Sequence, residues 1–127
     1  MKDILIVEDD EQVRKALKRS LSGKGYTVTT ARNGQEALDG LEHTPVLPRL
    51  IIADLMMPVM DGWTFRRQLL TRPHWAAIPV IILSGSGCDV SGAALPGVHY
   101  VPKPVTLREL FETVATAIAV PFVEPVN

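Results

Sequence analysis

The sequence predicts an α/β domain in which five parallel strands form one doubly wound sheet with helices on both faces. Short apolar runs alternate along the chain with segments whose apolar residues recur at helical spacing, and this order is typical of right-handed βαβ units. The length of 127 residues and a hydrophobic fraction of 46% allow one domain with a single core. We expect residues 1–120 to form that domain and residues 121–127 to form a C-terminal tail.

Five apolar runs are the expected strands, and they cover residues 3–7, 26–31, 50–53, 80–83 and 98–101. The first, third and fourth runs are continuously apolar and rich in β-branched residues, which indicates strands buried on both faces. The second run, "YTVTTA", contains threonines and is expected nearer an edge of the sheet. The fifth run is the weakest of the five.

Helical patterns fill the segments between these runs. After the first run, apolar residues at helical spacing are followed by two glycines that end the pattern; they are Val13, Ala16, Leu17 and Leu21. Asn33 is expected to cap a helix through Leu41, with Glu36 completing a capping box. A third helix is expected from about Asp61 to Leu70.

The last helical pattern follows the fifth run. Thr106 is expected to cap this helix, with Glu109 at the reciprocal position. Its apolar face is expected to consist of Leu107, Leu110, Phe111, Val114 and Ile118.

Composition excludes several classes of protein. Thirteen basic and fourteen acidic residues give a net charge of −1, so nothing points to nucleic acid or an anionic membrane as a partner. Cys88 is the single cysteine, which excludes a disulfide framework and a thiol-rich metal site. No apolar run is long enough to cross a bilayer. We therefore expect a cytoplasmic protein.

Polar residues follow four of the five expected strands. In an open α/β sheet, ligands bind outside the carboxyl ends of the strands, at the switch point in strand order. The residues there are Glu8, Asp9 and Asp10 after the first strand, Asp54 after the third, Ser84 after the fourth and Lys103 after the fifth. With the order 2-1-3-4-5, the first and third strands are neighbours, which brings Asp9 beside Asp54.

This set of groups suits phosphoryl transfer to an aspartate. Clustered carboxylates repel one another unless a cation lies between them, and their hard oxygens suit Mg²⁺. Lys103 adds a point charge for a phosphoryl group, and Ser84 adds a hydrogen bond. An aspartate carboxylate such as that of Asp54 is a known type of nucleophile toward phosphorus.

Four motifs now identify a family resemblance. They are "ILIVEDD", "DLMMPVMDG", "VIILSG" and "YVPKP", in that order along the chain. Together they resemble the receiver domain of response regulators in two-component signalling, including the chemotaxis regulators, over nearly the whole chain. The resemblance implies a flavodoxin-like fold. It also implies a helix between the fourth and fifth strands, but residues 85–97 include four glycines and Pro96. We therefore expect that fourth helix to be short or absent.

The resemblance also implies roles for single residues. Asp54 would accept phosphate from a histidine kinase or phosphotransfer protein. Mg²⁺ would be bound by Asp9, Asp54 and the backbone carbonyl of Met56, with Glu8 acting through water. Ser84 and Lys103 would contact the phosphoryl group, Tyr100 would be a switch residue, and the Lys103–Pro104 peptide would be cis.

Such a domain is a signalling phospho-acceptor rather than an enzyme with a separate substrate. It would catalyse its own phosphorylation and slow dephosphorylation, and the change would be transmitted to a downstream protein or output domain. The chain is compatible with a single-domain regulator and with a receiver that belongs to a larger protein or hybrid kinase.

Other functions and simpler explanations compete with this hypothesis. A flavodoxin-like electron carrier needs neutral phosphate-binding donors after the first strand, where this chain has "EDDEQ". An aspartyl-phosphate phosphatase needs a general acid two residues after the nucleophile, where this chain has Met56. A pseudo-receiver, which binds partners without phosphorylation, is the main alternative.

Asp10 is interpreted as a helix cap only, and Tyr100 could be a simple packed aromatic. The three methionines Met56, Met57 and Met60 are interpreted as packing residues.

Overall fold

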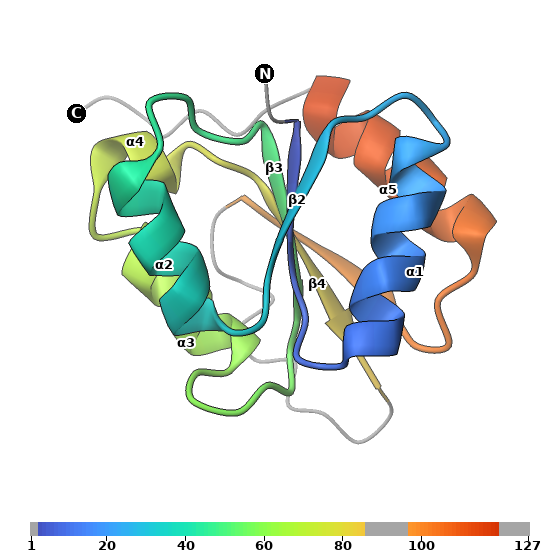
Figure 1. Cartoon of the computed structure of the whole chain (residues 1–127), viewed down its shortest axis with the longest axis horizontal. Helices are drawn as coiled ribbons and strands as arrows, with labels where there is room; N and C mark the ends of the chain where they lie inside the picture. Colours follow the sequence, from blue (N-terminus) through green and yellow to red (C-terminus); the bar gives the residue numbers. More distant parts are fainter. Residues whose placement is uncertain (1–2, 86–96, 120–127) are drawn as a thin grey trace.

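The computed structural model describes residues 3–85 and 97–119, which form a parallel sheet between two layers of helices (Figure 1). The five strands are β1 (Ile4–Val7), β2 (Val28–Ala31), β3 (Leu50–Asp54), β4 (Val80–Ser84) and β5 (Val98–Pro102). Their order is β2-β1-β3-β4-β5, and every pair is parallel. The predicted fold class is therefore confirmed, and β2 lies at an edge as its threonines indicated.

The helices are α1 (Glu11–Ser22), α2 (Gly34–His43), α3 (Gly62–Leu69), α4 (Pro73–Ala76) and α5 (Leu107–Ala119). The four-residue α4 precedes β4 and was not predicted, because one turn of helix carries no periodic pattern. It is a different element from the helix that the family resemblance implies between β4 and β5. The prediction for that helix falls mainly on residues 86–96, which lie outside the described residues, as does the predicted tail.

Side-chain caps begin four of the helices, three of them at the residues that the sequence predicted as caps and one at Asp61, which was predicted only as the start of α3. Asp10 accepts hydrogen bonds from the backbone of Gln12 and Val13, and its interpretation as the cap of α1 is confirmed. The caps of the other three helices are Asn33, Asp61 and Thr106. The capping box of α2 is shifted by one residue, because the Glu36 carboxylate accepts from the backbone N–H of Arg32.

Two apolar clusters hold the layers together, one on each face of the sheet. On one face α2 and α3 bury Leu41, Phe65 and Leu69 against the sheet. On the other face α1 and α5 bury Leu21 and Leu110. Burying side chains on both faces explains why β1, β3 and β4 are continuously apolar.

Three residues predicted to lie on apolar helix faces are exposed. Val13 and Leu107 retain 40% and 53% of their accessible surface, and Ala16 is also exposed. Their helical spacing is correct, but all three line an open hollow of about 380 Å³ between α1 and the β5–α5 connection. Among the described residues, no helix is long and apolar enough to cross a membrane.

Candidate functional site

The carboxyl ends of β1 and β3 bring three carboxylates together. Val7 pairs with Ala53 in the parallel register, so the residues that follow, Glu8 and Asp54, lie at the same edge of the sheet. One carboxylate oxygen from each of Glu8, Asp9 and Asp54 lies within 4.8 Å of the other two. Glu8 and Asp54 are buried and Asp9 is exposed. The predicted meeting of Asp9 with Asp54 is therefore present in the structure.

Glu8 is the most deeply buried of these acids. Its Oε1 accepts a hydrogen bond of 3.1 Å from the backbone N–H of Asp10, whereas its buried Oε2 has no hydrogen-bond partner among the described residues. The pKa of the Glu8 carboxyl is raised from 4.5 to about 7, mainly by burial; the hydrogen bond from Asp10 opposes this rise and the negative charge of Asp54 adds to it. A buried carboxylate oxygen without a donor is a favourable position for a cation or its bound water.

Lys103 provides positive charge beside these acids. Its Nζ lies 2.8 Å from Asp54 Oδ2. The backbone N–H of Lys103 donates to the Ser84 carbonyl oxygen over 2.6 Å, which fixes the end of β5 against the end of β4. The Lys103–Pro104 peptide is cis, as the family resemblance implied.

Ser84 and Tyr100 are joined by a hydrogen bond in which the Ser84 hydroxyl donates to the Tyr100 hydroxyl oxygen. Ser84 is fully buried at the end of β4, and Tyr100 is 38% exposed on β5. The structure brings Ser84 to the same edge of the sheet as Asp54, because Asp54 pairs with Leu83 in the register of β3 and β4.

Met56 follows Asp54 by two residues and contacts it through the backbone. Its N–H donates to Asp54 Oδ1 over 3.2 Å. The side chain of Met56 is 67% exposed, so the interpretation of this residue as packing is wrong. Met57 is buried and Met60 packs against the same core, so the interpretation holds for those two. The two neighbours of Met56, Leu55 and Met57, are buried instead.

The donor set fits Mg²⁺. The three carboxylates offer hard oxygen ligands, and the exposure of Asp9 leaves room for water on one side. The unpartnered Oε2 of Glu8 supports the same conclusion, because it lacks the donor that a buried carboxylate oxygen otherwise requires.

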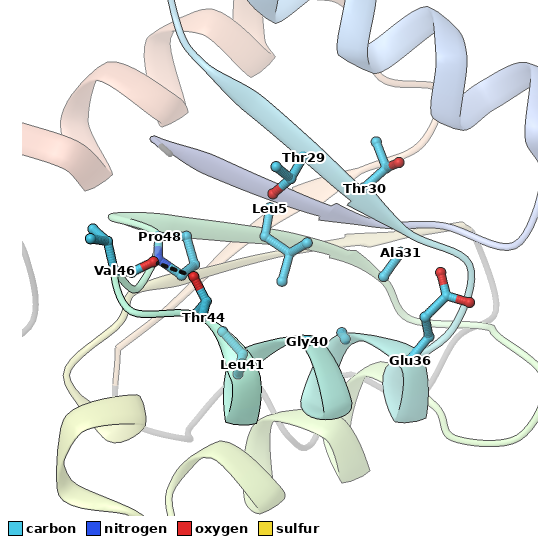
Figure 2. Close-up of a pocket in the computed structure, with 11 residues that line it drawn as sticks. Leu5, Thr29, Thr30, Ala31, Glu36, Gly40, Leu41, Thr44, Val46 and Pro48 are labelled. Carbon is cyan, nitrogen blue, oxygen red and sulfur yellow. Dashed lines mark hydrogen bonds between the residues drawn. The ribbon is translucent and has the colours of Figure 1, made fainter. Parts of the chain in front are cut away.

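A separate hollow lies away from this edge, between β2 and α2 (Figure 2). It has a volume of about 220 Å³ and is lined mainly by small and apolar side chains, including Leu5, Ala31 and Leu41. None of the candidate site residues lines it. The carboxylate cluster is therefore not part of this hollow.

Sequence reasoning missed two residues that support the site. The Arg14 guanidinium donates to the backbone carbonyl of Glu8 over 2.9 Å, and the backbone N–H of Gly62 donates to the Leu55 carbonyl over 2.8 Å. Both bonds end on backbone atoms. Neither the charge pattern of α1 nor the "DG" pair could have revealed these contacts, since the sequence does not show which carbonyl a donor will reach.

The family comparison agrees with this geometry. The model of the response regulator receiver domain matches residues 4–115. This chain belongs to the response regulator receiver domain family. It is thus a receiver domain of two-component signal transduction, and the family that the four motifs indicated is confirmed.

Among curated relatives, response regulator MprA of Mycobacterium sp. (strain KMS) is 39% identical over 110 residues, which are 84% of this chain and 46% of that protein. MprA of Mycobacterium avium (strain 104) gives the same values. The receiver domain therefore spans about half the length of these relatives.

Solved structures share the whole fold. The signal receiver domain of a signal transduction histidine kinase from Syntrophus aciditrophicus is 34% identical, with a TM-score of 0.86 over 100% of this chain and 98% of that chain. Chemotaxis protein CheY4 of Vibrio cholerae is 27% identical, with a TM-score of 0.79 over 91% of this chain and 98% of that chain.

Proposed function

We propose that this receiver domain accepts a phosphoryl group on Asp54 from the phosphohistidine of a histidine kinase or a phosphotransfer protein. One observation carries the proposal: the buried carboxylate of Asp54 lies between a lysine ammonium and two further carboxylates, at the carboxyl edge of the sheet. The family relationship and the names of the relatives support the same role.

The transfer needs one new bond and one broken bond. An oxygen of the Asp54 carboxylate bonds to phosphorus, and the bond from phosphorus to the donor imidazole nitrogen breaks with its electron pair on nitrogen. Lys103, 2.8 Å from Oδ2, balances negative charge on the transferred oxygens. The N–H of Met56 holds Oδ1 and so orients the carboxylate for attack.

Asp9, Asp54 and the carbonyl of Met56 are the proposed Mg²⁺ ligands, and Glu8 acts through bound water. When bound, Mg²⁺ supplies positive charge to the phosphoryl oxygens and offsets repulsion among the carboxylates. The close approach of the three carboxylates and the unpartnered Glu8 oxygen support this assignment.

Ser84 and Tyr100 are proposed to pass the change to a partner-binding surface. A phosphoryl oxygen on Asp54 is a stronger acceptor than the Tyr100 hydroxyl, so the Ser84 hydroxyl would turn toward the phosphate. Loss of the Ser84–Tyr100 hydrogen bond would free the half-exposed ring to change position. NMR of the Tyr100 ring with and without phosphorylation tests this step, and an unchanged ring signal would contradict it.

The proposed function is tested by incubation with a small-molecule phosphodonor. Phosphoramidate is suitable because its phosphorus–nitrogen bond resembles that of phosphohistidine. We expect intact-mass spectrometry to show one added phosphoryl group with Mg²⁺, and none after chelation. The nearly isosteric Asp54→Asn variant should remain folded and unlabelled. A parent protein that stays unlabelled with Mg²⁺ would favour the pseudo-receiver instead.

A further inference from the structure

The first residue of α3 lies against the backbone of the strand that carries Asp54. A Cβ atom placed on Gly62 would lie 3.0 Å from the Asp54 carbonyl oxygen and 3.0 Å from the Leu55 Cα, and 3.2 Å from Ile82 Cδ1. Two of these three atoms belong to the backbone and cannot rotate away. The N-terminus of α3 can therefore approach β3 this closely only with glycine at position 62.

Backbone hydrogen bonds near Gly62 also fix the turn that follows Asp54. The N–H of Gly62 donates to the Leu55 carbonyl over 2.8 Å, and the N–H of Leu55 donates to the Leu83 carbonyl over 2.8 Å. Both peptide groups of Leu55 are thereby fixed, one by β4 and one by α3. The next residue is Met56, whose N–H bonds to Asp54 Oδ1.

We propose that Gly62 is a positioning residue for the cation site, because it sets the backbone from Asp54 to Met56 so that the Asp54 carboxylate and the Met56 carbonyl face the same ion. The inference rests on the proposed function, in which these two groups bind Mg²⁺. Mg²⁺ accepts only near-octahedral geometry with short ligand bonds. A shift of a few tenths of an ångström in this backbone, which a methyl group at position 62 would force, therefore weakens binding.

Two other helical glycines provide matched controls. A Cβ atom on Gly34 would lie 2.9 Å from Met60 Sδ, which can move aside, and 3.3 Å from Met60 Cβ and Cγ, so all of its close contacts are to one side chain and none is to backbone. A Cβ atom on Gly40 would meet no atom within 4 Å. Gly34→Ala thus introduces crowding at the start of a helix without touching the Asp54 backbone, and Gly40→Ala introduces the methyl group alone.

The test is calorimetric titration of Mg²⁺ into the parent protein and the Gly62→Ala, Gly34→Ala and Gly40→Ala variants, with equilibrium unfolding of each without Mg²⁺. We expect Gly62→Ala to bind Mg²⁺ at least about ten-fold more weakly than the parent. Gly34→Ala and Gly40→Ala should bind within about two-fold of the parent, whatever their stability.

A double variant separates positioning from general destabilisation. Ile82→Val removes the Cδ1 atom that a methyl group at position 62 would meet, but the contacts to Asp54 and Leu55 remain. The Gly62→Ala/Ile82→Val protein should therefore lose less stability than the two single substitutions added together, without regaining Mg²⁺ affinity. If Gly62→Ala or the double variant bound Mg²⁺ as tightly as the parent protein, the inference about Gly62 would be wrong, but the proposed function would be unaffected. A parent protein that binds no Mg²⁺ would contradict the proposed function as well.

Discussion

Lys103 and Asp54 are separated by 49 residues in the chain, yet the lysine Nζ lies 2.8 Å from Asp54 Oδ2. The contact spans the ends of β3 and β5, which are not neighbours in the sheet. It is possible because β4 lies between them and Lys103 follows β5 directly, so its long side chain extends back over the end of β4.

Replacing Lys103 with Met should slow phosphorylation by a small-molecule donor by about 10²- to 10³-fold, the usual effect of removing one group that stabilises charge in a transition state. Mg²⁺ affinity should not fall, because the substitution removes a positive charge near the cation. Phosphorylation rates from intact-mass time courses and Mg²⁺ titration check the two expectations.

The matched control is Lys18→Met, which removes an exposed lysine from α1. This variant should be phosphorylated at the parent rate. A parent rate in Lys103→Met itself would show that the contact with Asp54 plays no part in the transfer.

Mg²⁺ binding should depend on pH through Glu8. The pKa of this carboxyl is raised from 4.5 to about 7, so much of it is protonated at neutral pH. A cation competes with that proton, and we therefore expect Mg²⁺ affinity to rise as the pH increases through about 7 and then to level off. Titrations between pH 5.5 and 8.5 on the parent and on Glu8→Gln measure this, and an equal slope in the two proteins would contradict it.

The same raised pKa determines how stability without Mg²⁺ depends on pH. The folded state holds the Glu8 proton more tightly than the unfolded state, so this group stabilises the fold less as the pH rises from 4.5 to about 7. Above about pH 7 the destabilising contribution of Glu8 no longer changes with pH. Glu8→Gln should therefore raise the free energy of unfolding at pH 8 by up to about 3 kcal/mol, as measured by denaturant titration with chelator present.

The strand ends were predictable and the contacts that fix them were not. The sheet was predictable from the continuous apolar runs in β1, β3 and β4. Its acidic edge was predictable from the polar residues that follow the strands, since parallel order places all the carboxyl ends together. Gly62 and Arg14 act on backbone carbonyls, and a sequence does not show which carbonyl lies nearby. Val13 and Leu107 have the spacing of core residues but are exposed at an open hollow, which helical spacing alone does not reveal.

Arg66 is another residue whose contacts could not be predicted from the sequence. An arginine in a helix is ordinarily exposed, but this one is fully buried, and its guanidinium donates to the Ile78 carbonyl over 2.8 Å and to the Ala76 carbonyl over 3.1 Å. These bonds link α3 to the end of α4 and to the segment between α4 and β4.

Arg66→Met should therefore lower the free energy of unfolding by about 3 kcal/mol, because it leaves two carbonyls without a donor. The neighbouring Arg67 is exposed, and Arg67→Met should change stability by less than about 0.5 kcal/mol. Denaturant unfolding of both variants makes the comparison, and equal effects would contradict the structural role of Arg66.

Val59 is in a strained backbone conformation in the turn between β3 and α3. Its φ is +73°, which lies in a region of conformational space that β-branched residues rarely occupy. Its side chain is 77% exposed. Val59→Asn should raise the free energy of unfolding by about 1 kcal/mol, because asparagine tolerates this conformation. Val46→Asn, at an exposed valine without a positive φ, should have little effect. Equal changes in the two variants would show that φ is not the cause.

The central claim is that Asp54 carries the phosphoryl group. The most direct measurement is chemical mapping: the protein is phosphorylated with phosphoramidate and Mg²⁺, the acyl phosphate is reduced with borohydride, and peptides are sequenced by mass spectrometry. The account predicts that position 54 alone is converted to homoserine, and only in the phosphorylated sample. Conversion at Asp9 or Glu8 with Asp54 unmodified, or no conversion at all, would contradict it.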